Sequence, residues 1–562
     1  MTIEQNTANA RARLSARERT MPPHNLAPAT IGFSTYGHLL IAGSEDQIRL
    51  AAAGLSGMAS ITLLVTERIS NMDEQHLELA LNAVPELKPI TSELVAIKGF
   101  LGQFQVSVKS GQQTESLSKL TANRAHFDLV LDLNTTPLLA QELLPAGYFH
   151  VHNDSDKLQQ VQSELPDYIG DFEKPRYFHI NSDVCAHSER GLTGCTRCLD
   201  VCPAEAISSV KEQIEINPHL CHGAGGCATA CPTGAISYAL PQPARLIDYL
   251  QQLVANYQEA GGEQPVILLH DHDSGRAALE EIFQQIPDNI LPVELEELAA
   301  AGIEIWLGLL AIGCNHVVLL DTPATPTSMR ELLDRELRVA RELLSGMGYP
   351  ADRIKLIDAG GDTAKQLTLL EDQLSGATQP NTVRLQARTA KRETLFEAID
   401  LLANQAEVHP EAVSLPNGSA YGEIIVNADK CTLCLSCTAV CPTGALKAGT
   451  EQPELHFTEQ SCVQCNLCER ACPEQAISLN SRILLTDQRR ESRVIHEEPA
   501  FECISCSKPF APKSTVEKMI EKLSDHPYFK GPAINRLKMC EDCRVRDIHT
   551  DLAKNPLKQL EL

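Results

Sequence analysis

The chain has 562 residues, 43% of them hydrophobic and 22% charged, and its formal net charge is -25. This length exceeds what one hydrophobic core supports, and the composition excludes a globally disordered protein. The acidic balance disfavours nucleic acid and anionic lipid as partners and favours proteins that carry basic patches.

The N-terminal segment and the hydropathy of the chain bear on its location. Residues 1–30 are polar and end in a proline-bearing stretch, so they are predicted to form a flexible arm. They show neither an apolar export signal nor an adjacent arginine pair, which favours a cytoplasmic location. No run approaches the roughly 18 uncharged apolar residues of a spanning helix, so no direct membrane insertion is expected.

Residues 31–175 are predicted to form an α/β domain of the Rossmann or flavodoxin-like type. Apolar runs at 38–42, 60–65 and 127–133 alternate with amphipathic stretches, as in a parallel sheet covered by helices. Gly43 ends the first run, but no G-x-G-x-x-G motif follows it. A structural domain is therefore favoured over a dinucleotide site.

The next block, residues 176–242, predicts a bacterial-type dicluster ferredoxin module. In the ordinary motif, C-x2-C-x2-C-x3-C-P, three cysteines bind one cubane and the cysteine before proline binds the neighbouring cluster. This block departs from the motif twice. Nine residues separate Cys185 from Cys195, and Ala224 stands where the second half should have cysteine. The crossover rule predicts one [4Fe-4S] cluster on four cysteines: Cys185, Cys195, Cys198 and Cys231.

The other cluster of this module keeps three cysteines, Cys202, Cys221 and Cys227. It is interpreted as a [3Fe-4S] cluster, or as a three-cysteine [4Fe-4S] cluster whose last iron binds water, substrate or His222. The three-iron and open forms are favoured over His222, because a histidine beside a ligand is more often a bystander. No general base or nucleophile is recognisable here, so no catalytic residue is predicted and the protein is not expected to act as an enzyme alone.

A second α/β domain is predicted over residues 243–370. Apolar runs at 265–270, 315–320 and 353–358 alternate with helices, the longest of which ends near Gly346. The group His270, Asp271, His272 and Asp273 follows the first run, where α/β sites tend to lie. A solvated loop is favoured over a metal site for these four residues.

Residues 293–358 loosely resemble the small iron-sulfur subunit of methyl-viologen-reducing hydrogenases. The resemblance lies in a Gly-Cys strand entry at Cys314 and in the run from Leu343 to Leu356. Cys314 is alone in this domain and is interpreted as a buried structural thiol. Residues 371–420 are predicted to be a linker with one helix near 393–402.

The strongest signal is a second dicluster module over residues 421–485. Both of its halves match the ferredoxin motif without deviation. One [4Fe-4S] cluster is predicted on Cys431, Cys434, Cys437 and Cys472, and its partner on Cys462, Cys465, Cys468 and Cys441. Zinc knuckles are rejected here because zinc sites use two CxxC pairs and do not show the C-x2-C-x2-C-x3-C-P spacing.

Residues 486–562 are predicted to form a zinc-ribbon-like segment. Its two CxxC pairs, Cys503 with Cys506 and Cys540 with Cys543, are separated by 33 residues. Four such cysteines favour one tetrahedral zinc ion over an additional iron-sulfur centre or free thiols. The lysines of the spacer alternate with acidic residues, so a solvated helix face is favoured over nucleic-acid binding.

The order of these blocks gives a multidomain α+β and α/β fold with repeated ferredoxin modules. It resembles a bacterial family of large 4Fe-4S dicluster-domain, polyferredoxin-like proteins, which are often associated with molybdenum-dependent formate dehydrogenases. The resemblance implies electron relay between a redox enzyme, such as formate dehydrogenase, and an acceptor. Four clusters are expected in two pairs, and each pair is expected to form a short electron-transfer path. Two alternatives stay open: an accessory or maturation factor, and an oxidoreductase subunit with flavin or nucleotide in the first α/β domain.

Overall fold

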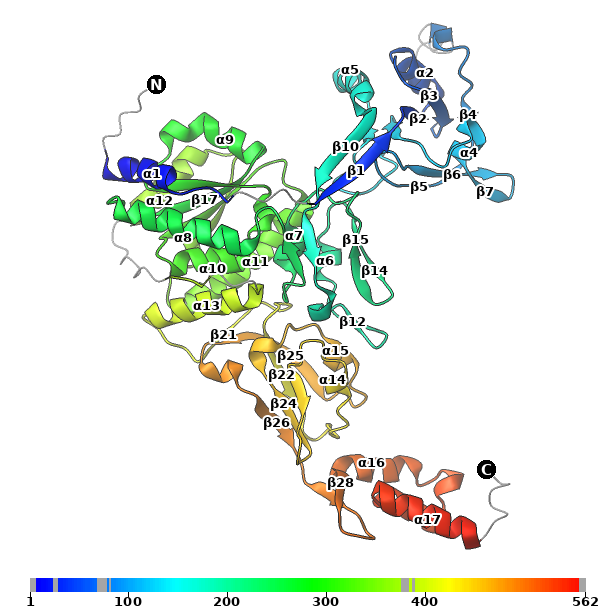
Figure 1. Cartoon of the computed structure of the whole chain (residues 1–562), viewed down its shortest axis with the longest axis vertical. Helices are drawn as coiled ribbons and strands as arrows, with labels where there is room; N and C mark the ends of the chain where they lie inside the picture. The colour runs from blue at the N-terminus through cyan, green and yellow to red at the C-terminus, as the bar shows by residue number, and fades with distance from the viewer. Residues whose placement is uncertain are drawn as a thin grey trace.

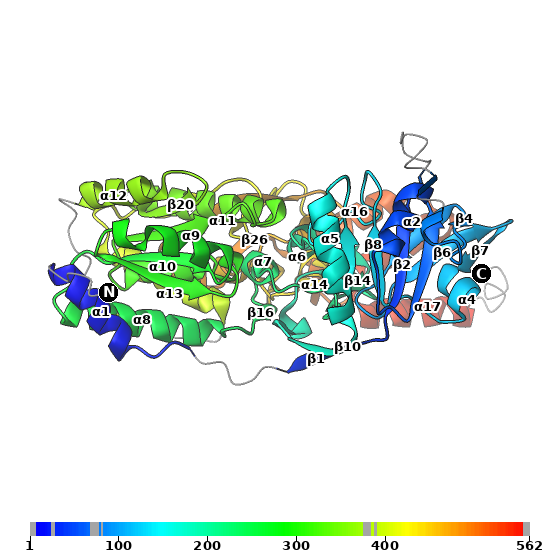
Figure 2. The same ribbon diagram turned by 90° about the horizontal axis from the view of Figure 1, so that it is seen from above.

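The computed structural model describes residues 7–23, 29–67, 78–79, 82–374, 384–386 and 390–554. Two α/β domains lie at one end of an elongated molecule, and the two cysteine-rich modules follow between them and below them (Figure 1). The C-terminal segment forms the opposite end. Seen from above, the first and second α/β domains flank the modules (Figure 2).

The first α/β domain contains a five-stranded sheet in the order β4-β3-β2-β8-β9, and all of its pairings are parallel. Its strands are β2 (His38–Gly43), β3 (Ser60–Val65), β4 (Ile90–Thr91), β8 (Leu129–Asp132) and β9 (Tyr148–His150), with helices α2 (Glu45–Ala53), α4 (Leu117–Ala122) and α5 (Ser155–Glu164). Strands β5 (Leu94–Lys98), β6 (Gln105–Ser110) and β7 (Gln113–Ser116) form a separate antiparallel sheet. Alternate residues of β2 enter different cores, which is the period of two expected for a strand covered on both faces.

A two-stranded ribbon connects this domain to the first cysteine-rich module. Strands β1 (Thr30–Thr35) and β10 (Gly170–Pro175) pair antiparallel along their whole length. The side chain of Lys174, at the end of β10, donates hydrogen bonds to the carbonyl oxygens of His219 and Cys221, at 2.7 and 2.9 Å. The ribbon therefore ends directly on the loop that carries Cys221.

The second α/β domain is a four-stranded parallel sheet in the order β18-β17-β19-β20. Its strands are β17 (Val266–Asp271), β18 (Ile290–Leu295), β19 (His316–Asp321) and β20 (Ile354–Asp358), and its helices are α8 (Pro243–Glu259), α9 (Ser274–Ile282), α10 (Ile303–Ala311), α11 (Thr327–Gly346) and α12 (Thr363–Leu374). All nine residues of α10 are buried, including Trp306. Cys314 is fully buried beside them, which agrees with a structural thiol.

Residues 8–19 form a helix, α1 (Ala8–Arg19), where the sequence predicted a flexible arm. Ala12 and Ala16 are buried in the core of the second α/β domain, next to α8. Arg13 donates to the carbonyl oxygen of Pro287 and forms an ion pair with Asp288, at 3.1 Å each. The small alanine side chains let this polar helix pack closely against the second α/β domain. Hydropathy alone does not reveal this contact.

The predicted linker also contains part of a folded core. Its helix, α13 (Lys391–Gln405), buries Leu395, Phe396 and Ile399 against α10. Its opposite side reaches the second module, where Asp400 forms an ion pair with the buried Arg489. The helix therefore bridges the second α/β domain and the second module.

Replacing Leu395 by alanine tests this assignment of α13 to the core. Leu395 is 1% exposed, so the cavity should cost about 2–5 kcal/mol and lower the melting temperature of the second α/β domain in calorimetry. Leu369→Ala is the matched control, because Leu369 is 51% exposed on α12. Equal effects of the two substitutions would show that α13 is not a core element.

The remaining elements are short and belong to the modules and the C-terminal segment. The first module contains β11 (Phe178–Ile180), β12 (Ser188–Glu189), β13 (Leu192–Thr193), α6 (Arg197–Asp200), β14 (Ile207–Val210), β15 (Gln213–Ile216), α7 (Gly226–Ala230) and β16 (Ile236–Tyr238). The second contains β21 (Ala412–Ser414), β22 (Gly422–Val426), α14 (Ser436–Ala439), β23 (Leu446–Ala448), β24 (Glu454–Phe457), α15 (Leu467–Arg470), β25 (Ile477–Leu484) and β26 (Arg493–Glu497). The C-terminal segment contains β27 (Ala500–Glu502), β28 (Pro509–Pro512), α16 (Lys513–Leu523) and α17 (Glu541–Lys554).

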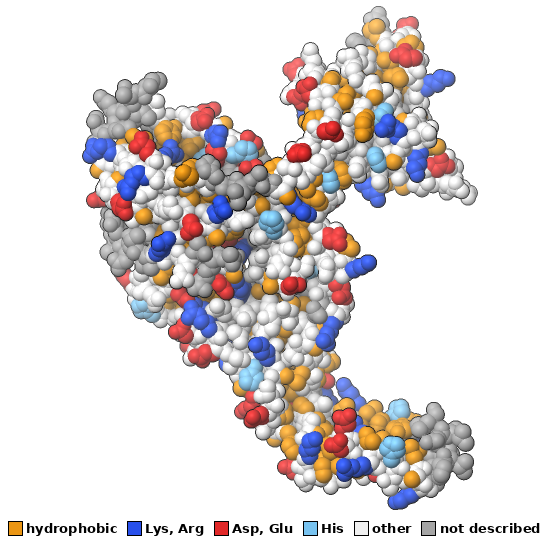
Figure 3. All heavy atoms as spheres, viewed as in Figure 1, with side chains coloured by type: hydrophobic (Ala, Val, Ile, Leu, Met, Phe, Trp, Pro, Cys, Tyr) orange, Lys and Arg blue, Asp and Glu red, His pale blue; other side chains and the backbone are white. Residues whose placement is uncertain are grey.

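The surface carries charges of both signs. Lys and Arg side chains are interspersed with Asp and Glu on the face shown in Figure 3, without a large patch of one sign. Within the described ranges, no helix is both long and apolar enough to cross a bilayer.

Candidate iron-sulfur centres

The second module brings its eight motif cysteines to two cavities. Site 4 is a cavity of about 340 Å³ whose lining includes Cys431, Cys434, Cys437 and Cys472. Site 3 is a cavity of about 350 Å³ whose lining includes Cys441, Cys462, Cys465 and Cys468. In each site the cysteine before proline comes from the other half of the motif, as the crossover rule predicts.

Backbone conformation explains how such short loops aim their thiols inward. Leu433, Leu435, Gln464 and Asn466, which flank Cys434 and Cys465, all have positive φ angles between 49° and 67°. This left-handed conformation bends the chain at every second residue and keeps consecutive cysteines on one side of the loop.

Burial disfavours the charged thiolate form of several of these cysteines. Burial, followed by the neighbouring Cys431 and Cys434, raises the pKa of Cys437 to about 12. Burial also raises the pKa of Cys465 to about 11, although the backbone N–H of Leu467 opposes the shift. Thiolates are the form that ligates iron, so these sites suit a metal cluster whose positive irons offset the clustered charge.

The first module keeps one complete set of cysteines. Cys198 and Cys231 are buried in one core cluster with Cys185 packed against it, and these three residues with Cys195 define site 2. Burial and the nearby Cys231, Cys195 and Cys185 raise the pKa of Cys198 to about 12. The nine residues between Cys185 and Cys195 form the hairpin β12–β13, which is closed by a hydrogen bond of 2.9 Å from the Cys195 N–H to the Ala186 carbonyl. The hairpin thus returns the chain to Cys185.

Site 1 of the same module holds three cysteines in a cavity of about 360 Å³, lined in part by Cys202, Cys221 and Cys227. Gly223 and Gly225 have φ angles of +84° and +83°, so the loop keeps the conformation seen around Cys434 in site 4. Ala224 therefore occupies the position of the missing cysteine.

Site 1 has a largely apolar lining that includes Ala224, Phe178 and Met329, together with His222. Burial and the nearby Lys174 lower the pKa of His222.

The sulfur atoms before the prolines have matching polar contacts in the two modules. The backbone N–H of Ala206 donates to Cys202 Sγ, and that of Ala476 donates to Cys472 Sγ, both at 3.3 Å. Both donors lie four residues after the cysteine, so the Cys-Pro turn itself supplies them. Such bonds to sulfur stabilise the reduced state of a cluster and tune its potential.

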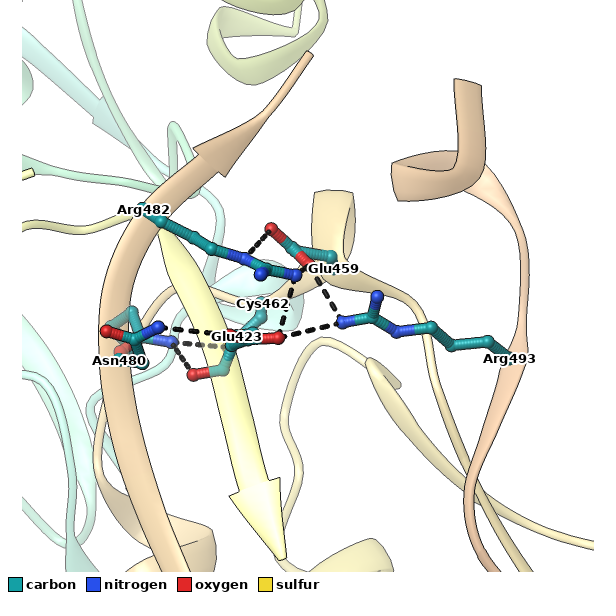
Figure 4. A network of polar contacts seen from close by, with 7 residues as sticks. Glu423, Glu459, Cys462, Asn480, Arg482 and Arg493 are labelled. Atoms are coloured by element: carbon teal, nitrogen blue, oxygen red, sulfur yellow. Dashed lines mark hydrogen bonds and ion pairs between the residues drawn. The ribbon is translucent and has the colours of Figure 1, made fainter. Parts of the chain in front are cut away.

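A network of polar side chains covers site 3 (Figure 4). Arg482 forms a bidentate contact with Glu459, at 3.1 and 2.8 Å, and both Arg482 and Arg493 contact Glu423. Gln464 donates to the Glu423 carbonyl at 3.1 Å and to Cys462 Sγ at 3.4 Å. The network ties strands β22, β25 and β26 to the cluster loop and fixes the position of Cys462.

The C-terminal cysteines form a site of a different shape. The sulfur atoms of Cys503, Cys506, Cys540 and Cys543 all lie within 4.8 Å of one another, and three of the four residues are buried. Despite a desolvation cost, backbone N–H groups, that of Cys540 first, lower the pKa of Cys503 to about 6. Four convergent thiols with a stabilised thiolate suit one tetrahedral metal ion.

The remaining candidate residues have structural roles. Asp271 accepts hydrogen bonds from the backbone N–H groups of Asp273 and Gly275, at 3.0 Å each, and so fixes the start of α9. His270 is buried, and its Nδ1 lies 2.9 Å from the Asp271 carbonyl oxygen. Within the described ranges, the convergent metal-ligand set lies at the C-terminal cysteines and not here.

Cations at the cluster loops were not predicted from the sequence. Lys174, Lys391 and Arg392 donate to backbone carbonyl oxygens beside cluster cysteines. Their acceptors are 45 to 163 residues away in the sequence, so no local spacing marks them.

Comparison with known proteins supports the cysteine motifs. Models of the 4Fe-4S dicluster domain match residues 193–235 and 430–477. The chain is 43% identical over 60 residues to hydrogenase-4 component A of Escherichia coli (strain K12), covering 11% of this chain and 27% of that protein. It is 35% identical over 60 residues to indolepyruvate oxidoreductase subunit IorA of Pyrococcus horikoshii, covering 10% and 8%. It is 33% identical over 55 residues to a 7Fe ferredoxin of Hydrogenibacillus schlegelii, covering 10% and 70%.

Proposed function

The chain belongs to the 4Fe-4S dicluster ferredoxins, and we propose that it relays electrons between a redox enzyme and an acceptor through four clusters. The observation that carries the proposal is the convergence of cysteines from separate motif halves on shared sites. Bound clusters supply one-electron transfer. The chain holds them on thiolates, excludes water with apolar walls and donates N–H groups to the sulfur atoms.

The proposed cofactors are three [4Fe-4S] clusters at sites 2, 3 and 4 and a [3Fe-4S] cluster at site 1. The three cysteines and the alanine at position 224 support the three-iron form, as does similarity to a relative named as a 7Fe ferredoxin. The C-terminal cysteines are proposed to bind one zinc ion.

The proposed partner is a multisubunit redox enzyme. Two relatives are named as a component of a hydrogenase and a subunit of an oxidoreductase. The family resemblance of the whole chain points to formate dehydrogenase as the donor. The net charge of -25 favours a docking surface with basic residues on that enzyme.

Metal analysis of anaerobically purified protein, combined with EPR during stepwise reduction, tests this proposal. The expected result is about fifteen irons and one zinc per chain, with signals that appear and disappear reversibly. Stable clusters that cannot be reduced reversibly would indicate an accessory factor instead. A bound yellow cofactor would indicate a flavin-containing oxidoreductase subunit.

Replacing Ala224 by cysteine is expected to convert site 1 to a [4Fe-4S] cluster. The loop already has the backbone conformation of a ligating cysteine, so the new thiol should reach the fourth iron. Iron should rise by about one atom per chain, and the EPR signal of the oxidised three-iron cluster should disappear. Ala448→Cys, at an exposed position, should leave both unchanged. An unchanged signal in Ala224→Cys would contradict the three-iron assignment.

A further inference from the structure

We propose that the two modules dock so that sites 1 to 4 form one continuous series, and that Lys391 and Arg392 hold the junction and raise the reduction potentials at sites 2 and 3. This inference rests on the proposed electron-transfer function. The sequence predicted two separate pairs of clusters, whereas this inference joins them into one electron-transfer path.

The junction is a direct packing contact beside the cysteines of the two inner sites. A Cβ atom added to Gly194 would lie 2.7 Å from Leu467 Cγ and 2.8 Å from the Ala186 carbonyl oxygen. Gly194 precedes Cys195 of site 2, and Leu467 precedes Cys468 of site 3. Only a residue without a side chain allows this approach, so the contact is specific to the glycine.

Further contacts surround that point. Arg470 donates to the carbonyl oxygen of Thr193, at the end of β13. Cys185 of site 2 and Pro442, which follows Cys441 of site 3, line the same cavity. The loop that carries Cys185 and Cys195 of site 2 thus packs against the cysteine loops of site 3.

Within each module the sites are also adjacent. Helix α6 packs against α7 in the first module, and α14 packs against α15 in the second. Cys198 of site 2 and Cys227 of site 1 are buried in one core cluster, and Cys437 of site 4 and Cys468 of site 3 are buried in another. Because electron tunnelling falls steeply with distance, three successive short steps form one path from site 1 to site 4.

Lys391 and Arg392 are the first two residues of α13, and their side chains contact different modules. Lys391 Nζ donates to the carbonyl oxygens of Ala228 and Thr229, at 2.8 and 2.5 Å, in the turn of α7 between Cys227 and Cys231. Arg392 Nε donates to the Gln460 carbonyl at 2.6 Å, and its Nη2 donates to that of Cys462. The N-terminal end of α13 therefore contacts both modules.

The two cations are shielded from solvent. The Lys391 side chain is 12% exposed and lies 3.7 Å from Glu304, which offsets part of its charge. The Arg392 guanidinium lies 5.1 Å from the ring centres of both Phe396 and Tyr421. A weakly screened positive charge beside a cluster favours the reduced, more negative state.

The charge effect is tested with Arg392→Gln and Lys391→Gln, each assayed for iron content and for cluster potentials by EPR-monitored titration. Arg392→Gln should lower the reduced-to-oxidised ratio of site 3 about tenfold at fixed potential, or about 59 mV for one electron. Lys391→Gln should shift site 2 in the same direction. Arg392→Lys should restore part of the shift, and the exposed Lys447→Gln is the matched control. Potentials that match the control, with iron retained, would overturn the role of the cations.

Continuity of the series is tested on the fully reduced wild-type protein and on Gly194→Val. Spin coupling across all four sites is expected in the wild type, and Gly194→Val should retain iron but lose the coupling between sites 2 and 3. Gly32→Val is the control, since a Cβ there meets nothing within 4 Å. Wild-type protein that relaxes as two isolated pairs would overturn the inference while leaving the proposed function intact. Protein without iron would overturn the proposed function itself.

Discussion

Replacing Cys472 by serine is expected to abolish the cluster at site 4, although its other three ligands lie 35 to 41 residues earlier in the chain. The structure places Cys472 with Cys431, Cys434 and Cys437 around one cavity. Serine is a poor ligand for iron in place of thiolate, so about four irons per chain should be lost or the cluster should degrade. Iron analysis and EPR of the reduced protein measure the loss.

A second substitution makes the crossover itself testable. Cys434→Ser should remove the same EPR signal as Cys472→Ser, whereas Cys465→Ser should remove a different one. Cys314→Ala is the control, because Cys314 is buried in the second α/β domain and should leave every signal in place. If Cys472→Ser and Cys465→Ser removed the same signal, the ligands would be sorted by sequence half and the assignment of sites 3 and 4 would be wrong.

The ligand sets could be predicted because the relevant geometry is local. A loop of the form C-x2-C-x2-C places its thiols by backbone torsions alone, and proline fixes where the fourth cysteine turns away. The same logic identified Ala224 as the position of the missing ligand. The positive φ angles at Gly223 and Gly225 show why the loop tolerates the change without altering its course.

The packing of the modules could not be predicted, because it depends on contacts between distant segments. Lys391 reads as a solvated lysine at the start of a linker helix, yet its partners are carbonyl groups 162 and 163 residues earlier. Gly194 reads as part of an insertion, whereas its lack of a side chain permits the contact with Leu467. Backbone acceptors have no sequence signature, so neither role leaves a motif.

The same reason explains the two misplaced boundaries. Helix α1 docks through alanines and arginines, which have low hydropathy, so its sequence resembles a solvated arm. Helix α13 has a clear amphipathic pattern, but the pattern does not identify the core that covers it. For α13 the helix could be found from sequence while its partner could not, whereas for α1 neither the helix nor its partner was predicted.

Removing the metal from the C-terminal cysteines is expected to unfold that segment without loss of iron from the clusters. The buried core there consists of Cys503, Cys540 and Cys543, with Phe510 and Met539 packed against it. Such a small core cannot offset the entropy of ordering the segment, so metal binding must supply the stability. Structural zinc contributes about 10–16 kcal/mol in zinc-finger peptides at neutral pH.

The Cys540→Ser protein should therefore contain no zinc when its metals are measured by mass spectrometry. Residues 500–554 should become sensitive to proteases, while the iron content stays constant. The segment also has a route to influence the relay, because Lys518 on α16 lies 2.5 Å from Glu474, which lines site 4. Loss of zinc should free this lysine and expose the loop of site 4, shifting its potential but not those of sites 1 and 2. Iron in place of zinc at these cysteines would contradict the metal assignment, and an unchanged site 4 would show that the segment is only an independent appendage.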